Sequence, residues 1–295
     1  MNHPQGSPSV YKSNALIEAS YRLSPIEQRI MLACISQVRR DQQITDEVLY
    51  SVSAADISAL TGNSSKSVYE DLAKAALRLK RREVWIKQES NGKGKRPRTL
   101  ITGWVQSIIY IESEGRVELR FTKDMLPYLT QLTEQFTRYA LADVAQMTSS
   151  HAIRLYELLC QWRGIGKREV EIVWLRESFQ LGEKYPAIKD FKRRVIQPAV
   201  DQINEHSPLW VKWDQRKTGR RVTHLTFTFG EKATTTSSKA RQAKIKGKVG
   251  GNSQSSPGAL YGIPRAVIES KARPGEDYED TALRLLSESK QSAKS

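Results

Sequence analysis

The sequence predicts an α+β fold, a tandem pair of winged helix-turn-helix domains with a basic, disordered C-terminal tail. The first observation is an order of elements that occurs in residues 23–145 and again in residues 146–230: helix, short strand, two helices, strand, basic loop, strand. The second is the Lys-, Ser- and Gly-rich composition of residues 231–258, which indicates a disordered basic linker. Residues 1–22 are expected to form an N-terminal arm. Residues 259–295 are expected to be an appendage that is partly helical or folds only on a partner.

The first domain begins with two capping boxes, in which a Ser and an acidic residue three positions later satisfy each other's backbone N–H groups. Ser24–Glu27 starts a helix expected to reach about Arg40, and Ser53–Asp56 starts a second helix that ends at Gly62. A third helix follows from Ser64 or Ser65, because apolar residues recur there on one helical face. β-Strands are predicted at 49–52, 84–87, 99–111 and 117–121, where β-branched and alternating residues are found.

The second domain repeats this order with little residue identity to the first. Helices are predicted at about 149–162, 175–181 and 187–206, and β-strands at 170–173, 209–213 and 222–229. The last two strands flank Arg216–Arg221, a basic hairpin end. A helical segment around Thr122–Met147 is expected to join the two domains.

The charge of the chain indicates a polyanionic partner. Its 295 residues contain 47 Lys and Arg against 32 Asp and Glu, a formal net charge of +15 at pH 7. Such a chain is attracted to nucleic acid or to an anionic membrane surface. No apolar run is long enough to span a membrane, and the N-terminus lacks the layout of a secretory signal. Because Cys34 and Cys160 are expected to be reduced core residues, we expect a cytoplasmic protein without a membrane partner.

Residues 187–206 are the candidate for reading DNA bases, because they form the third helix of the second winged helix. Arg and Gln pair bidentately with guanine and adenine in the major groove. A core stripe is predicted at Phe191, Val195, Ala199 and Ile203. The opposite face is predicted to read bases through Lys189, Asp190, Arg193, Arg194 and Gln197. Phosphate contacts are predicted for Lys184, Lys192, Arg216, Lys217, Arg220 and Arg221. The alternative is a basic face that meets only solvent.

The first domain is predicted to grip the DNA backbone rather than to read bases. Glu70 and Asp71 lie on the exposed face of its third helix and would repel phosphates. The loop Lys93–Arg98 is interpreted as a second basic wing, either a phosphate clamp or a solvated loop. The predicted backbone contacts of this domain are Lys66, Lys74, Arg78, Arg81, Lys93, Lys95, Arg96 and Arg98.

The residues that metal and nucleotide chemistry require do not cluster in the sequence. The chain has 4 His and 2 Cys, without a His-x-His pair or a Cys cluster, so neither a zinc site nor a metal nuclease is expected. No glycine-rich stretch has the spacing of a phosphate-binding P-loop. The sequence therefore predicts a binding protein with no cofactor, no metal and no catalytic residues. A nickase or a primase is the enzymatic alternative.

Five blocks spread over about residues 10–230 carry a family resemblance. They are Leu23–Arg29 (LSPIEQR), Leu119–Leu129 (LRFTKDMLPYL), Ser150–Leu159 (SHAIRLYELL), Phe191–Ala199 (FKRRVIQPA) and Asp201–Asn204 (DQIN). Together, and in this order, they resemble the plasmid replication initiator (Rep) family that acts at iteron origins.

This resemblance implies a tandem winged-helix protein whose monomers bind directly repeated sites, the iterons, in double-stranded origin DNA. It also implies homodimers, associated through the first domain, that bind an inverted operator and repress the protein's own gene. A host replication initiator and the replicative helicase are the implied protein partners. The expected function is thus an initiator that promotes local opening of the origin and recruits the helicase. The alternative is a winged-helix transcription repressor without a replication role.

Overall fold

The computed structural model describes residues 8–39, 44–62, 67–88, 98–130 and 136–233, with the short pieces 259–260, 263–264 and 285. The chain divides into two compact units, Met1–Thr234 and Thr235–Ser295. In the second unit, β12 (Ala259–Leu260) and β13 (Ile263–Pro264) form an antiparallel pair. The predicted disordered linker, residues 231–258, is wrong at its start, because β11 (Arg221–Glu231) includes Glu231 and the Lys232 N–H donates to the Pro208 carbonyl at 2.8 Å. Residues 234–258 lie outside the described residues, so their disorder stays a prediction.

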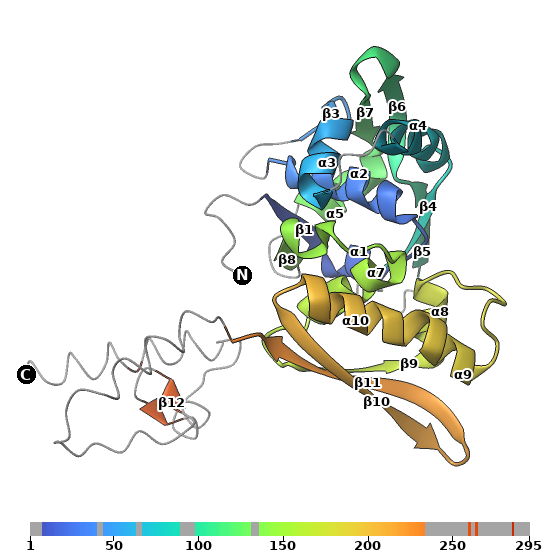
Figure 1. Cartoon of the computed structure of the whole chain (residues 1–295), viewed down its shortest axis with the longest axis vertical. Helices are drawn as coiled ribbons and strands as arrows, with labels where there is room; N and C mark the ends of the chain where they lie inside the picture. Colours follow the sequence, from blue (N-terminus) through green and yellow to red (C-terminus); the bar gives the residue numbers. More distant parts are fainter. Residues whose placement is uncertain are drawn as a thin grey trace, which may run out of the picture. The chain divides into compact units, whose positions relative to one another are not determined.

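The first unit confirms the predicted pair of winged helices (Figure 1). Domain 1 contains α2 (Pro25–Ser36), β3 (Tyr50–Ser53), α3 (Ala54–Thr61), α4 (Ser67–Leu79), β4 (Glu83–Gln88), β5 (Arg98–Gly103), β6 (Val105–Ile111), η1 (Glu112–Glu114) and β7 (Arg116–Phe121). The connecting segment contains η2 (Lys123–Met125), α5 (Leu126–Thr130), β8 (Phe136–Ala140) and α6 (Ala142–Ala145). Domain 2 contains α7 (Ser150–Cys160), β9 (Lys167–Glu171), α8 (Ile172–Ser178), α9 (Ile188–Phe191), η3 (Lys192–Ile196), α10 (Gln197–His206), β10 (Leu209–Thr218) and β11 (Arg221–Glu231).

Both predicted capping boxes are present and set the starts of α2 and α3. Ser24 accepts a hydrogen bond from the Glu27 N–H, and the Glu27 carboxylate accepts one from the Ser24 N–H at 2.7 Å. The Ser53–Asp56 box makes the same exchange. Helix α2 ends at Ser36, earlier than predicted. The side chain of the next residue, Gln37, donates to the Ser51 carbonyl at 2.7 Å and so ties the helix end to β3.

The sheets of domain 1 place its wing elsewhere than predicted. The sequence pattern predicts one strand over 99–111, but the buried Trp104 interrupts it, and its two halves join different sheets. β6 pairs with β7 and β7 with β3, whereas β5 pairs with β4 and β4 with β2 (Ser20–Tyr21). The interpretation of Lys93–Arg98 as a wing is therefore wrong, because this loop connects β4 to β5. The wing is the β6–β7 hairpin, whose end carries Glu112 and Glu114.

Residues 8–22 belong to the folded core and do not form an arm. β1 (Ser9–Ser13) pairs antiparallel with β8, and β2 extends the β4–β5 sheet. α1 (Asn14–Glu18) buries Leu16 and Ile17 completely. These elements are too short to show a hydrophobic period, so the sequence pattern could not reveal them.

Domain 2 has the predicted order of elements, with longer strands. Its sheet has the order β10–β11–β9, and α7 packs against α10. β10 and β11 extend into the predicted basic loop, so only Gly219 and Arg220 form the turn, and Gly219 has a φ of +61°. A glycine suits this position because a residue with a Cβ rarely adopts a positive φ. Helix α8 begins at Ile172, three residues before the predicted start.

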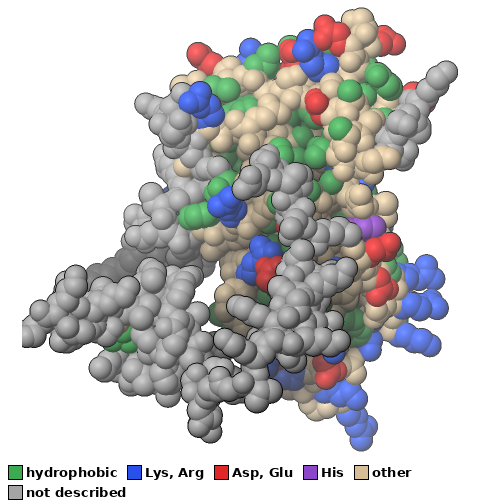
Figure 2. Space-filling model, turned by 60° about the vertical axis from the view of Figure 1, so that its left-hand side comes forward, with side chains coloured by type: hydrophobic (Ala, Val, Ile, Leu, Met, Phe, Trp, Pro, Cys, Tyr) green, Lys and Arg blue, Asp and Glu red, His purple; other side chains and the backbone are tan. Residues whose placement is uncertain are grey.

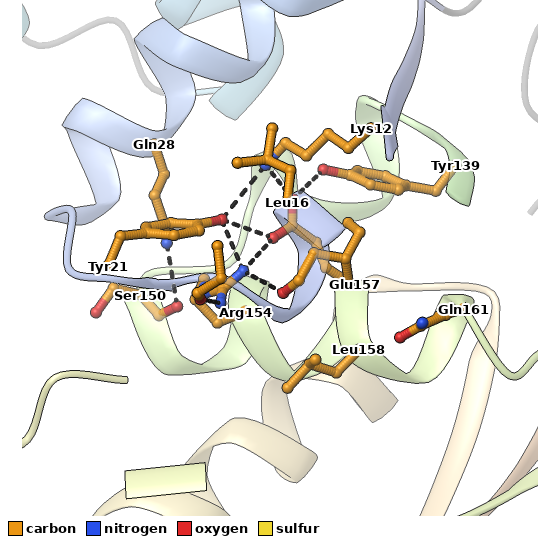
Figure 3. Close-up of polar contacts among 12 residues, drawn as sticks. Lys12, Leu16, Tyr21, Gln28, Tyr139, Ser150, Arg154, Glu157, Leu158 and Gln161 are labelled. Carbon is orange, nitrogen blue, oxygen red and sulfur yellow. Dashed lines mark hydrogen bonds and ion pairs between the residues drawn. The ribbon is translucent and has the colours of Figure 1, made fainter. Parts of the chain in front are cut away.

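A buried polar cluster joins the N-terminal segment to α7 (Figure 3). Lys12 Nζ and Tyr139 Oη each donate to Glu157 Oε1 at 2.6 Å. Tyr21 Oη and Arg154 Nη1 donate to Glu157 Oε2 at 3.1 and 3.2 Å. The Lys12 and Glu157 side chains are only 3% and 1% exposed. Because these residues come from β1, β2, β8 and α7, the cluster fixes the first helix of domain 2 against the N-terminal and connecting segments.

Candidate nucleic-acid interface

The candidate base-reading helix is continuous from Ile188 to His206 but contains one π-helical stretch, η3. Pro198 explains this stretch, because it has no N–H to donate to the Arg194 carbonyl four residues earlier. The Gln197 N–H instead bonds to the Lys192 carbonyl, five residues back. A π turn adds a residue to the helical turn and rotates the side chains that follow. The helix is therefore locally irregular where the predicted base-reading residues lie.

The faces of this helix are those predicted. Phe191, Val195, Ala199 and Ile203 are all buried, at 0% or 1% exposure, and form the core stripe. The opposite face exposes Lys189, Arg193, Arg194 and Gln197. Asp190 lies on the same side, where its carboxylate is 3.1 Å from Arg193 and 3.9 Å from Arg194. The carboxylate can thus orient two guanidinium groups, which remain 63% and 59% exposed.

Gln197 is held by two neighbours. The indole nitrogen of Trp213, on β10, donates to Gln197 Oε1 at 3.0 Å. Gln197 Nε2 donates to the carboxylate of Asp201, one helical turn further on, at 2.7 Å. The sequence pattern did not single out Trp213 as a functional residue, because a tryptophan in a strand is most simply explained by packing.

The turn before the helix is organised by Arg176, a residue the sequence prediction missed. Its guanidinium donates to the carbonyls of Tyr185 and Lys184 at 2.7 Å each and to that of Gly182 at 3.2 Å. It also lies 5.5 Å from the centre of the Phe191 ring. This turn places Lys184, a predicted phosphate contact, at the start of the helix. No local sequence pattern marks an arginine that binds loop carbonyls.

The other predicted phosphate contacts of domain 2 fall into two groups. Lys192 donates to Gln215 at 2.7 Å, and Arg216 makes two hydrogen bonds to Glu169 at 2.8 and 2.9 Å. The Arg216 guanidinium holds the pKa of the Glu169 carboxyl below its usual range. Lys217, Arg220 and Arg221 are exposed at the hairpin end, with no carboxylate partner in the part of the chain that the structure describes. In Figure 2, Lys and Arg side chains project at the lower end, where the β10–β11 hairpin lies in Figure 1.

Domain 1 offers a poorer surface for phosphates. Lys74 pairs with Glu70 at 3.3 Å, and Arg78 pairs with the buried Glu27 at 2.9 Å. The same helix also exposes an apolar side chain, Leu77, which is 75% exposed and offers nothing to a phosphate. Arg98 is exposed as the first residue of β5, whereas Lys66, Lys93, Lys95 and Arg96 lie outside the described residues. Asp and Glu side chains gather at the upper end of Figure 2, where the β6–β7 wing lies in Figure 1.

A groove of about 810 Å³ brings basic residues of the two domains together. Arg81 of domain 1, a predicted phosphate contact, lines it with Arg22 and Lys87. On the domain 2 side the lining includes Arg176 and Gly182 from the turn that precedes the base-reading helix. The lining also includes Glu18, Glu83 and Glu177, so the groove carries charges of both signs between domain 1 and the turn before that helix.

Ionisable groups elsewhere have structural surroundings. No group of His, Cys, Asp and Glu that could hold a metal is found among the described residues. Burial lowers the pKa of His151 to about 4, with Arg22 and Lys184 adding to the shift, and the ring stacks on Phe179. Both cysteines are free and buried, and burial raises the pKa of the Cys160 thiol to about 12. Within the described ranges, no helix combines the length and the apolar character needed to cross a bilayer.

Comparisons with known proteins match both domains. A model of Initiator Replication protein, WH1, matches residues 9–160, and one of Initiator Rep protein, WH2, matches residues 171–229. The chain is 29% identical over 223 residues to an uncharacterized 27.6 kDa protein of Escherichia coli, covering 72% of this chain and 91% of that protein. It is 27% identical over 228 residues to a replication initiation protein of Escherichia coli, covering 74% of this chain and 68% of that protein.

One solved structure covers both winged helices. The crystal structure of Pi initiator protein in complex with iteron DNA has a TM-score of 0.65 and 18% identity to this chain. The similarity covers 78% of this chain and 99% of that one.

Proposed function

The chain belongs to the initiator replication protein family, and on that premise we propose that it is a plasmid replication initiator that binds directly repeated sites in double-stranded origin DNA. One observation carries this proposal. The third helix of domain 2 buries an apolar stripe and turns Lys189, Arg193, Arg194 and Gln197 outward, beside a hairpin end that exposes Lys217, Arg220 and Arg221. These are the residue types that read base edges and hold phosphates.

Within this proposal the two domains have different roles. Domain 2 reads bases through its third helix and contacts phosphates through Lys184, Lys217, Arg220 and Arg221. Arg216 contributes less, because Glu169 already occupies its guanidinium. Domain 1 contacts the backbone mainly through Arg81 and the β4–β5 hairpin, since its wing is acidic and Lys74 and Arg78 are paired. The similar fold of Pi initiator protein bound to iteron DNA supports this assignment.

The proposed mechanism uses binding energy and no catalytic step. Protomers on adjacent repeats bend the DNA, and the added contacts offset the cost of deforming it and of opening a weakly paired neighbouring region. The host replication initiator and the replicative helicase would then join the opened origin in the cytoplasm. A homodimer, associated through domain 1, would bind an inverted operator and repress the protein's own gene.

The proposal is tested by a footprint of the purified full-length protein on the DNA that flanks its own gene, at two salt concentrations. Evenly spaced protections over direct repeats that persist at the higher salt are the expected result. A single protected palindrome at the promoter would instead favour a transcription repressor without a replication role. Diffuse coverage that disappears at the higher salt would contradict sequence-specific binding.

A further inference from the structure

The Gln197 side chain is the only one on the base-reading face that is bound at both ends of its polar group by residues of the described structure. Oε1 accepts from the Trp213 indole at 3.0 Å, and Nε2 donates to Asp201 Oδ1 at 2.7 Å. Gln197 itself remains exposed. Its amide is therefore ordered while it still faces outward.

The two neighbours allow a single orientation of this amide. An indole N–H can only donate, and an ionised carboxylate can only accept. If the amide turned by 180°, its NH2 group would face the Trp213 N–H and its oxygen would face the carboxylate of Asp201. Both hydrogen bonds would then be lost and replaced by repulsive contacts. Trp213 and Asp201 thus enforce the same orientation independently.

The strand β10 positions the reading helix at two points. Trp213 and Gln215 are two residues apart and so share one face of the strand. Trp213 holds Gln197, and Gln215 holds Lys192 at 2.7 Å. These contacts lie at the two ends of the π-helical stretch that Pro198 produces. The strand therefore fixes the Gln197 amide relative to the helix axis, whereas a glutamine without this hydrogen bond would sample several rotamers.

The hydrogen bonds that Gln197 has left define what it can recognise. One lone pair of Oε1 and one N–H of Nε2 remain after the two internal bonds. A neighbouring acceptor and donor complement the N6 amino group and the N7 atom of adenine in the major groove. Guanine offers two acceptors at the same edge, and so matches only half of this amide. We propose that Trp213 and Asp201 are positioning residues that hold the Gln197 amide so that it reads an adenine of the binding site.

This inference rests on the proposed function, and its test separates the two. Binding sites are selected from a randomised duplex library with the full-length wild-type protein, and then with Trp213→Phe, which keeps the ring but removes the N–H. Trp210→Phe is the matched control. Trp210 lies on the same strand and is 38% exposed, whereas Trp213 is partly buried against the core. The Trp210 ring covers Gly230, and among the described residues it makes no hydrogen bond to Gln197. Asp201→Asn is the second variant, since an Asn side chain accepts either amide orientation.

In the wild type, one position of the selected site is expected to prefer adenine by about tenfold to a hundredfold, and Gln197→Ala is expected to abolish that preference. Trp213→Phe and Asp201→Asn are each expected to reduce the preference at that same position about fivefold or more. Affinity for random duplex DNA is expected to stay within about twofold. Trp210→Phe is expected to select the wild-type site.

The outcomes distinguish the proposed DNA-binding function from the positioning role of Trp213 and Asp201. If the wild type selects no site, the proposed function fails. If the wild type selects a site but the Gln197-dependent position prefers another base, the adenine assignment is overturned. If Asp201→Asn and a folded Trp213→Phe both retain the full preference, or lose it at different positions, the positioning role is overturned. Because Asp201 is exposed, its variant tests the orientation even if Trp213→Phe does not fold.

Discussion

At the scale of single residues, Glu157 has a buried carboxylate that four side chains contact. Burial raises its pKa, but Lys12 and Arg154 outweigh that effect and hold the pKa below its usual range. The carboxylate is therefore ionised in the folded protein and balances two buried cations. Its bonds reach β1, β2 and β8, so the residue connects segments that are distant in sequence.

Glu157→Gln is expected to destabilise the protein strongly. The variant leaves Lys12 and Arg154 buried without a counter-charge, and breaking a buried ion pair in this way costs about 3–5 kcal/mol. Urea unfolding of the full-length variant measures the change. Glu183→Gln, at an exposed glutamate, is the control and is expected to change stability by less than about 0.5 kcal/mol. Equal stability of the two variants would show that the cluster contributes nothing.

The lowered pKa of the Glu27 carboxyl predicts how the stability of the folded protein depends on pH. Burial raises its pKa, but the Ser24 N–H, Arg82 and Arg78 together hold it below the usual value of 4.5. A lowered pKa means that folding favours the ionised form, so this contribution is complete above pH 4.5 and is lost as the pH falls through the folded pKa. Glu27→Gln is therefore expected to unfold at a lower temperature than the wild type at pH 7, and to lose less on acidification to about pH 3.5. If acidification lowered the unfolding temperatures of the wild type and the variant by the same amount, this role of Glu27 would be contradicted.

At the scale of elements, the π-helical stretch sets the relative direction of the base-reading side chains. Pro198→Ala restores the missing N–H and allows a regular α-helix, which would rotate Arg193 and Arg194 relative to Gln197. Affinity for the specific site is expected to fall about tenfold, a loss within the ~1–3 kcal/mol of one base contact. Affinity for random DNA is expected to stay unchanged. Titrations of both duplexes measure the difference, and an unaltered specific affinity would show that the irregular turn has no part in reading bases.

The β10–β11 hairpin carries two arginines, Arg220 and Arg216, whose surroundings differ. Arg220 is exposed without a carboxylate partner in the described chain, whereas Arg216 is bound by Glu169. Arg220→Ala is expected to weaken binding to specific and random DNA equally and to reduce the salt slope by about 0.9. Arg216→Ala is expected to change the slope less. A loss confined to the specific site would mean that Arg220 reads a base and does not bind a phosphate.

At the scale of the whole molecule, the distribution of charge predicts strong salt dependence. Of the net charge of +15, residues 1–230 carry +10 and residues 231–295 carry +5. In the described part of the chain, exposed cations lie on the hairpin and the base-reading helix, away from the acidic wing of domain 1. If each protomer neutralises about 6–10 phosphates, affinity is expected to fall roughly 10³–10⁵-fold between about 50 and 200 mM salt. Binding titrations over this range measure the slope. A slope near zero would exclude a phosphate-dominated interface.

Much of the fold follows from local sequence patterns. The capping boxes at Ser24–Glu27 and Ser53–Asp56, and the apolar stripe of residues 191–203, depend on neighbours within one or two helical turns. The order of these elements was therefore predictable, and so was the helix face that points outward. The family resemblance of the five sequence blocks agrees with the models that match residues 9–160 and 171–229.

The sequence by itself determined the order of elements in the two winged helices, the excess of basic over acidic residues, and the face of the base-reading helix that points outward. Each of these depends on composition or on residues close together in the chain. Only the tertiary structure decided that residues 8–22 are core, that the wing of domain 1 is acidic, and that Glu169 occupies Arg216. It alone also joined Trp213 to Gln197. These features come from contacts between distant segments. Strand alternation is the same whichever sheet a strand joins, and a charge run does not show which cations are paired.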